Sequence, residues 1–239
     1  MPVSKNRVNP PSPGNAGNSG RRYGGIDSDE RQRQRKQRLV EAGLAVFGQK
    51  GFHQSTVRDV CGHAQLTSRY FYESFEGMED LFRAVYTAVS KQLMQATVMS
   101  LTHCAPDPEK LAAAGLRTFY EFIREDPHRA RVMLIDAFTV GELMYEHTSQ
   151  TNQDFAHLIT GIMQQQFPGM DRFGLDTLQI ANGLVGANNH IAAQWVADKC
   201  RAPLEHVLRN SLMIYEACIE HARRMSKSAP EAKALQASD

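Results

Sequence analysis

The chain has 239 residues, of which 42% are hydrophobic and 22% charged, so it can build one large or two modest cores and is too apolar to be wholly disordered. No apolar stretch approaches the roughly 20 residues of a membrane-spanning helix, and the N-terminus lacks the apolar segment of a secretory signal, which favours a cytoplasmic protein. The net charge of +1 conceals an asymmetry, because residues 1–83 carry 13 Lys and Arg against 9 Asp and Glu, whereas the remainder is net acidic.

Residues 1–28 predict a disordered, mildly basic arm. They are rich in Pro, Gly, Asn and Ser, and they hold almost no large apolar side chains whose burial would offset the entropy of ordering. A helix is expected from about Asp29 to Lys50, with its apolar residues spaced for one buried face and Gly51 placed just after its end. Its first half contains the basic run RQRQRKQR at 31–38, which suits either a solvated helix face or a nucleic-acid contact.

Two short helices are expected next, at about 56–64 and 67–75. Thr56 and Thr67 are placed to cap them, and Asp59 completes a capping box on the first. Two short helices joined by a tight turn and packed on a longer one form a helix-turn-helix, whose second helix lies in the major groove of DNA. The residues spaced to face the core are Val57, Val60, Cys61 and Ala64 on the first helix and Phe71 and Phe75 on the second.

The start of the second short helix carries the expected DNA contacts, because its exposed side chains are hydrogen-bond donors and flat rings. Arg58, near the start of the preceding helix, is within reach of the same groove. The spacing alone also allows a plain helical hairpin with solvated Arg and Tyr side chains, since helix pairs of this length are common. The candidate contacts on the second helix are Thr67, Ser68, Arg69, Tyr70 and, on its flank, Tyr72.

The segment AGLAVFGQKGFHQSTVRDVCGHAQLTSRYFYESFEGMEDLF closely resembles the DNA-binding domain of the TetR (tetracycline-repressor) family. The match covers about residues 36–83 without a gap and includes the T-[VT]-x-x-I-A-x-x-A-G-[VL]-[ST] pattern of that family. Gln65 departs from it by replacing the usual turn glycine, and Met78 replaces a lysine often found at the start of the fourth helix. The residues in matching places are Phe47, Gly51, Phe52, Thr56, Val60, Ala64, Leu66, Thr67, Tyr72, Phe75, Glu79 and Leu81.

The resemblance assigns roles to the residues of this segment. It favours DNA contact over a solvated face for the last arginines of the basic run, including Arg38. It also implies a second, larger helical domain that binds a ligand and dimerises. The side chains that it directs toward bases are those of Ser68, Arg69 and Tyr70, and those that it directs toward phosphates are Thr56, Thr67 and Tyr72.

Residues 84–226 predict about six longer helices separated by Pro and Gly, followed by a flexible tail at 227–239. The last two helices, at about 174–198 and 203–225, carry continuous apolar stripes. Such stripes most often pack inside their own chain, but the resemblance implies that these two helices pair with their copies in a homodimer.

A ligand cavity is expected inside the larger domain, with Asn188, Asn189 and His190 as polar groups, although each of its residues also suits an ordinary core. No metal-ligand spacing, phosphate-binding loop or catalytic nucleophile motif is recognisable, so no metal, cofactor or enzymatic activity is expected. The four cysteines are scattered and suit small core positions. The candidate lining residues are Met133, Phe138, Met144, Phe155, Ile159, Met163, Asn188 and Trp195.

The sequence therefore predicts an all-α, homodimeric transcription regulator, with a helix-turn-helix domain at 29–83 and an effector-binding and dimerisation domain at 84–226. The expected function is that of a repressor released from a palindromic DNA operator by a small molecule. The helix that starts near Glu79 is the only covalent bridge between the domains, so its tilt would transmit the signal. The alternative is a ligand-independent or architectural DNA-binding dimer whose larger domain only dimerises.

Overall fold

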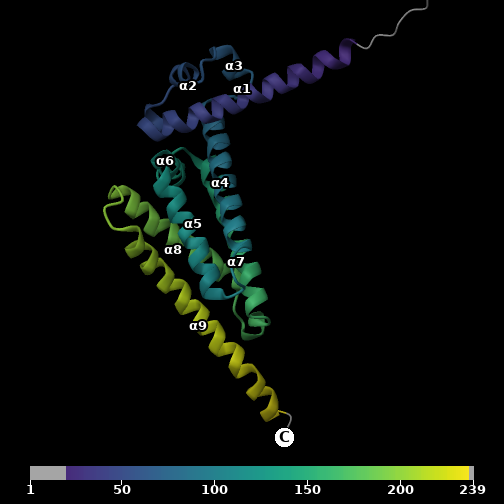
Figure 1. The fold of residues 1–239 in the computed structure, drawn as a ribbon, viewed down its shortest axis with the longest axis vertical. Coiled ribbons are helices and arrows are strands. Elements are labelled where there is room, and N and C mark those ends of the chain that lie inside the picture. The colour runs from purple at the N-terminus through teal and green to yellow at the C-terminus, as the bar shows by residue number, and fades with distance from the viewer. Residues whose placement is uncertain (1–19, 237–239) are drawn as a thin grey trace, which may run out of the picture.

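The computed structural model describes residues 20–236, in which the long helix α1 and two short helices form a cap on a longer helical body (Figure 1). No strand occurs within this range, so the predicted all-α class is confirmed. None of the helices described there has the length and apolar character needed to cross a membrane. The elements in chain order are α1 (Gly20–Lys50), η1 (Phe52–Gln54), α2 (Val57–Ala64), α3 (Ser68–Tyr72), α4 (Met78–Thr102), α5 (Pro108–Glu125), α6 (Pro127–Leu134), η2 (Asp136–Phe138), α7 (Glu142–Gln166), η3 (Met170–Phe173), α8 (Thr177–Ala197) and α9 (Leu204–Gln236), where η denotes a 3-10 helix.

The two terminal helices are longer than the sequence pattern predicts. Helix α1 begins at Gly20 rather than near Asp29; residues 20–28 contain no proline to interrupt the helix, although their three glycines are poor helix formers, which is why the sequence pattern predicts a later start. The rest of the expected arm, residues 1–19, lies outside the described residues. Helix α9 continues to Gln236, so the expected tail is helical up to that residue, and 237–239 also lie outside.

The cap consists of α1, α2 and α3 around the predicted aromatic anchors. Phe71 is fully buried and Phe75 is 3% exposed, as their spacing predicts. Helix α3 ends at Tyr72, three residues earlier than expected, but the Phe75 amide still donates to the Phe71 carbonyl at 2.9 Å in the turn that follows. Val60, Cys61 and Ala64 are buried as predicted on α2, whereas Val57 is only half-buried.

Helix α4 leaves the cap and runs along the body (Figure 1). Its first turns pack beneath α1, where the rings of Phe82 and Phe47 lie 5.2 Å apart, and its later turns contact α5. Helices α8 and α9 form one side of the body, with α9 packed along α5 and α8 along α7. The body is therefore a bundle whose long helices run away from the cap.

Candidate DNA-binding surface and effector cavity

The start of α2 is held by the predicted capping box. The Asp59 amide donates to Thr56 Oγ1 at 3.2 Å, and the Asp59 carboxylate accepts from the Thr56 amide at 2.9 Å. Lys50 Nζ lies 2.8 Å from the same carboxylate and joins the end of α1 to the start of α2. The Lys50 ammonium, followed by the hydrogen bonds from Thr56, lowers the pKa of Asp59 to about 2. In the free protein, the Thr56 side chain is therefore already occupied as the N-cap of α2.

The turn between α2 and α3 contains a non-glycine residue in the left-handed region. Gln65 has φ 53° and ψ 45°, a conformation that costs roughly 1–2 kcal/mol for an L-residue with a side chain. Arg38 Nη2 donates to the Ala64 carbonyl at 2.5 Å, next to this turn. The sequence offered Arg38 either as a solvated side chain or as a DNA contact, and the structure shows an intramolecular role for it at the end of α2.

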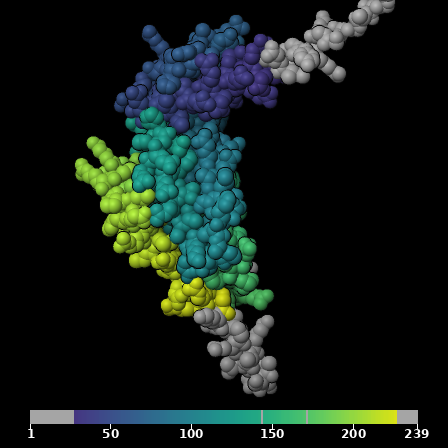
Figure 2. Space-filling view, viewed as in Figure 1, coloured from purple at the N-terminus to yellow at the C-terminus, as the bar shows by residue number. Residues whose placement is uncertain are grey.

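Helix α3 lies at the outer end of the cap, on the side of α1 opposite the body (Figures 1 and 2). Ser68 and Arg69 are exposed, and Tyr72 is 63% exposed. Arg69 Nε donates to Glu73 Oε1 at 2.8 Å, although 83% of the Arg69 side chain remains accessible. This surface presents a guanidinium, hydroxyls and a phenol, which are the groups that bind base edges and phosphates.

Three of the remaining candidates have distinct surroundings. Tyr70 is only half-buried in the cap, and the Arg35 guanidinium lies 4.6 Å from its ring centroid. Thr67 occupies the N-cap position of α3, but its side chain makes no capping hydrogen bond, so that part of the prediction is wrong. Arg58 is exposed on α2. The basic run thus supports α3 as well as facing solvent.

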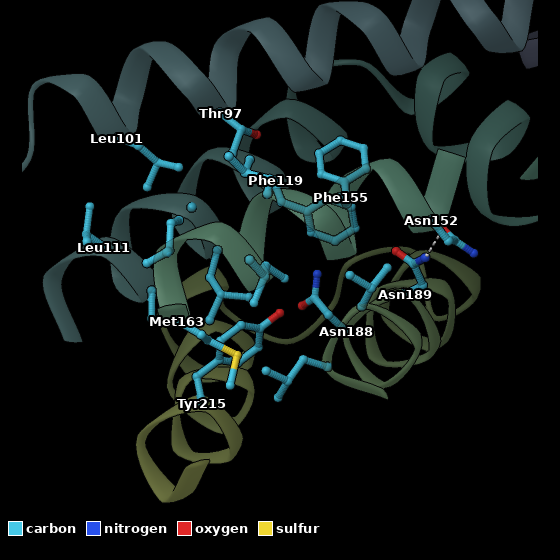
Figure 3. Close-up of a pocket in the computed structure, with 18 of the residues that line it drawn as sticks. Thr97, Leu101, Leu111, Phe119, Asn152, Phe155, Met163, Asn188, Asn189 and Tyr215 are labelled. Atoms are coloured by element: carbon cyan, nitrogen blue, oxygen red, sulfur yellow. Dashed lines mark hydrogen bonds between the residues drawn. The ribbon is translucent and has the colours of Figure 1, made fainter. Parts of the chain in front are cut away.

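A cavity of about 160 Å³ lies inside the body (Figure 3). Helices α4, α5, α7, α8 and α9 form most of its wall, and α6 and η2 contribute the rest. Among the residues that line it, none is Asp, Glu, Lys, Arg or His. Six of the eight residues proposed from the sequence line this cavity, namely Met133, Phe138, Phe155, Ile159, Met163 and Asn188.

The other two candidates, Met144 and Trp195, lie in the core instead of the cavity wall. Met144 is 2% exposed. The Trp195 indole donates from Nε1 to the Ala202 carbonyl at 2.9 Å, and its ring packs edge-on against Tyr120 at 5.8 Å. Both side chains are therefore used by ordinary packing, which was the alternative reading of each.

The cavity contains few polar groups, and one of them is unpaired. Asn188 is 8% exposed, and its side-chain oxygen has no hydrogen-bond partner. Asn189, by contrast, donates from Nδ2 to Asn152 Oδ1 at 3.0 Å. Burial raises the pKa of the Tyr215 phenol, which keeps it protonated. Figure 3 shows the Asn188 amide and the Tyr215 hydroxyl directed into the cavity. His190, the third polar candidate, is exposed on α8 and does not line the cavity.

The part of the cavity wall that comes from α4 and α5 was not predicted from the sequence. No local motif distinguishes those residues, since each follows the apolar spacing of any buried helix face. The missed residues include Thr97, Leu101, Leu111, Gly115 and Phe119.

A family model described as bacterial regulatory proteins, tetR family, matches residues 39–85, which run from the middle of α1 into the first turns of α4. The chain belongs to the TetR family of transcriptional regulators. It is a DNA-binding transcription regulator, and the family is not enzymatic.

A curated relative and two solved structures illustrate the similarity of this TetR-family chain to other regulators. An uncharacterised HTH-type transcriptional regulator of Bacillus subtilis (strain 168), YdgC, is 23% identical over 172 residues, which cover 70% of this chain and 84% of that protein. FadR from Bacillus subtilis in complex with stearoyl-CoA has a TM-score of 0.65 at 16% identity, covering 75% and 96% of the two chains. A regulator from Pseudomonas aeruginosa PAO1 has a TM-score of 0.63 at 18% identity, covering 80% and 94%.

In this TetR-family fold, the end of α1 packs directly against α6. A Cβ at Gly48 would overlap the backbone and side chain of His128, so only glycine permits this approach. Gly51 has a φ of 85°, in the left-handed region that favours glycine, and a Cβ there would overlap the Arg131 guanidinium. These two glycines let α1 and α6 approach closely.

Polar contacts extend this junction from η1 to η2. The Phe52 amide donates to Asp136 Oδ2 at 2.9 Å, between residues 84 positions apart in the chain. Asp136 is 6% exposed, and Arg131 Nε lies 3.6 Å from the same carboxylate oxygen. His53 Nε2 lies 3.2 Å from the Thr139 carbonyl oxygen. We refer to these contacts, together with those of Gly48 and Gly51, as the α1–α6 junction.

The α1–α6 junction lies next to the cavity wall along the chain. Met133, Leu134 and Phe138 line the cavity and lie within three residues of Asp136 in the chain. Helix α4 is the covalent bridge between the two regions, as predicted, and the junction adds a non-covalent connection that the sequence reading missed. A glycine inside the apolar face of α1, at Gly48, was the available signal, because such a glycine often marks a close approach.

Proposed function

We propose that this TetR-family regulator is a homodimeric repressor that acts in the cytoplasm and releases a palindromic operator when a small molecule enters the body. The observation that carries the proposal is a cavity that contains the buried, unpaired oxygen of Asn188. Part of the cavity wall comes from the segment around Asp136, which also contacts the cap. A cavity of this kind is the usual form of a small-molecule site. The stearoyl-CoA complex of Bacillus subtilis FadR, a protein of the same fold, supports an effector for this chain.

The proposed DNA-binding domain is 29–83, and α3 is its recognition helix. Arg69 and Ser68 are assigned to base edges, with Tyr70 beside them at the cap surface, because their exposure at the start of α3 suits the major groove. Thr56, Arg58, Thr67 and Tyr72 are assigned to phosphates or the groove edge. Arg38 also remains exposed enough to approach a phosphate.

The proposed dimer interface is the outer face of α8 and α9, within the domain proposed at 84–226. Gly183 and Gly186 are exposed on α8, and a Cβ at either would meet nothing within 4 Å. An interior helical glycine costs about 0.5–1 kcal/mol relative to alanine, so this face is best explained by the close approach of another helix. Met213 on α9 is 68% exposed, which adds exposed apolar surface on the second of the two helices.

The proposed switch uses both connections between the cap and the body. A ligand that moves Met133 or Phe138 would displace Asp136 relative to Phe52, and α4 would change its tilt with it. A dimer bound to half-sites one turn apart needs about 34–36 Å between its recognition helices, so a small tilt alters the fit. A ligand that favours one arrangement by 1–3 kcal/mol changes operator affinity roughly 5- to 150-fold.

The DNA contacts are tested by selecting an operator from a random duplex library and comparing two variants on it. Arg69→Ala should cost about 1–3 kcal/mol and relax base preference at one position of each half-site. Tyr72→Phe should weaken binding to cognate and scrambled DNA alike, because a phosphate contact carries no sequence information. Equal losses of Arg69→Ala on both DNAs would exclude base reading by this residue.

The switch is tested by reciprocal binding. Calorimetry of a bound effector with and without saturating operator should show that DNA weakens the effector by the same factor by which the effector weakens DNA. Effector affinity that is unchanged by DNA would favour the alternative function, an architectural DNA-binding dimer whose body only dimerises.

A further inference from the structure

The chemistry of the cavity restricts its ligand more closely than the family fold does. The side chains that line it include no carboxylic acid, no ammonium or guanidinium group and no imidazole. A carboxylate or an ammonium placed there would lose its hydration without gaining a counter-charge, which is strongly unfavourable. The ligand group inside the cavity is therefore uncharged.

Two charged groups that adjoin cavity-lining residues of α5 and α9 in the chain, Glu109 and Arg223, are paired with each other. Arg223 forms ion pairs with both Glu109 and Glu220, and the pair to Glu109 joins α9 to the start of α5. The residues beside them that do line the cavity, Pro108 and Ala222, are apolar. Arg223 is therefore already engaged by two protein carboxylates and is not free to pair with a carboxylate or a phosphate of a ligand.

The unpaired oxygen of Asn188 defines the polar requirement. A buried amide oxygen normally accepts a hydrogen bond, and leaving it without one is unfavourable. The neighbouring Asn189 already has a protein partner, so the two amides are not equivalent. A ligand that donates a hydrogen bond to Asn188 Oδ1 would satisfy this oxygen. The Tyr215 phenol lines the same space.

The volume of the cavity limits the size of the ligand group that it can hold. About 160 Å³ is slightly more than the ~150 Å³ of an apolar cavity that holds benzene. A substituted single ring fits this space, whereas a long fatty acyl chain requires the helices to separate. Mostly apolar walls, one buried acceptor without a partner and the size of a ring point to the same kind of molecule.

We propose that the cavity binds a compact, uncharged alkylphenol, whose hydroxyl donates a hydrogen bond to Asn188 Oδ1. The inference rests on the proposed function only in treating this cavity as the effector site. Binding itself requires no DNA, so the ligand class can be tested separately from the switch.

Four probes of similar size isolate each requirement: thymol, its methyl ether, p-cymene and para-isopropylbenzoate. Calorimetry on the full-length protein at neutral pH should show thymol binding about tenfold more tightly than the methyl ether or p-cymene, because only thymol supplies a donor. The carboxylate should bind most weakly. Equal affinities for thymol and p-cymene, preferential binding of the carboxylate, or no binding of thymol would each overturn the proposal.

The variant Asn188→Leu replaces the amide with an apolar side chain of similar size. Thymol should lose about tenfold in affinity, while p-cymene should bind as well or better. Asn182→Leu is the matched control on the same helix, since Asn182 donates to the Leu178 carbonyl and does not line the cavity. A preference for thymol that survives in Asn188→Leu would refute the assigned hydrogen bond.

Operator release is measured separately, by fluorescence anisotropy of the selected operator with each probe. If stearoyl-CoA alone binds and releases DNA, the ligand class is wrong and the proposed switch stands. If thymol binds with the expected dependence on Asn188 but leaves DNA affinity unchanged, the ligand class stands and the proposed switch fails.

Discussion

The DNA-binding surface and the cavity of this regulator are built in opposite ways. The recognition surface occupies one short stretch, from the cap of α2 to Tyr72 at the end of α3, and it presents exposed charged and polar groups. The cavity takes its wall from residues as distant as Tyr86 and Ala222, and its lining excludes charge. Local spacing therefore predicts the first site, whereas the second depends on how distant helices pack.

The α1–α6 junction is where the two regions meet. On the cap side it uses Phe52 and Gly51, next to the helix-turn-helix, and on the body side it uses Asp136 and Arg131, next to the cavity wall. Single substitutions in the cap, the junction and the cavity wall can therefore separate the folding of the cap, its coupling to the cavity and the filling of the cavity.

Neighbouring aromatic residues of α3 should show the largest contrast between folding and DNA binding. Phe71→Ala removes a fully buried ring and should destabilise the cap by about 3–5 kcal/mol. Tyr72→Ala removes a 63% exposed ring and should change stability by no more than about 0.5 kcal/mol while weakening DNA binding. Urea unfolding followed by circular dichroism measures both. A strongly destabilised Tyr72→Ala would contradict its assignment to the DNA surface.

The second-largest effect is expected from loss of the hydrogen bond that joins η1 to η2 at the α1–α6 junction. Asp136→Ala removes the acceptor of the Phe52 amide and the partner of Arg131, which should cost about 1–3 kcal/mol. The Phe52 amide should exchange faster with solvent deuterium, and reciprocal coupling between effector and operator should fall.

Asp126→Ala provides the matched control for the junction. Asp126 caps α6 through the His128 amide at 2.9 Å, so its loss weakens the same helix without removing a hydrogen bond to η1. Coupling that falls equally in the two variants would show that general weakening of α6, and not the Asp136 contact, carries the signal.

Filling the cavity should have a smaller effect on stability, of the opposite sign. Gly115 lies inside α5 and lines the cavity, and a Cβ there would meet nothing within 4 Å. Gly115→Ala should therefore stabilise the protein by about 0.5–1 kcal/mol and weaken ligand binding by occupying space. Gly62→Ala on α2, with the same open surroundings but outside the cavity, should leave ligand affinity unchanged. Thermal unfolding and calorimetry distinguish the two.

The smallest expected effect is a dependence of stability on pH through His147. Burial, and then the nearby charge of Arg83, lowers the pKa of His147 below 6.5, and Thr87 Oγ1 lies 2.8 Å from its Nε2. The unfolded chain therefore takes up the proton more readily. The stabilisation is present above pH 6.5 and is lost as the pH falls through the pKa of the folded state.

Urea unfolding of His147→Gln from pH 8 down to pH 5 should show a shallower loss of stability than the unmutated chain. His157→Gln, an exposed position on the same helix, controls for the loss of any histidine. A loss as steep in His147→Gln as in the unmutated chain would assign the dependence to other groups.

Much of the cap could be predicted because its determinants lie close together in the chain. The Thr56–Asp59 capping box and the burial of Phe71 and Phe75 each depend on residues no more than four positions apart, and the structure confirms them. Cavity residues were predicted less well, since a buried methionine on a helix looks the same whether it faces a core, as Met144 does, or a cavity, as Met163 does.

By itself, the sequence determined the helical class and the pair of short helices, because helical spacing, caps and the aromatic anchors are local properties, and its resemblance over residues 36–83 indicated the TetR family. Only the tertiary structure decided that Arg38 binds the Ala64 carbonyl, that Asp136 reaches Phe52 and that the Asn188 oxygen is left unpaired. The physical reason is that a hydrogen bond between residues far apart in the chain requires both helices to be in place. A polar atom is likewise known to lack a partner only when every neighbour around it is known.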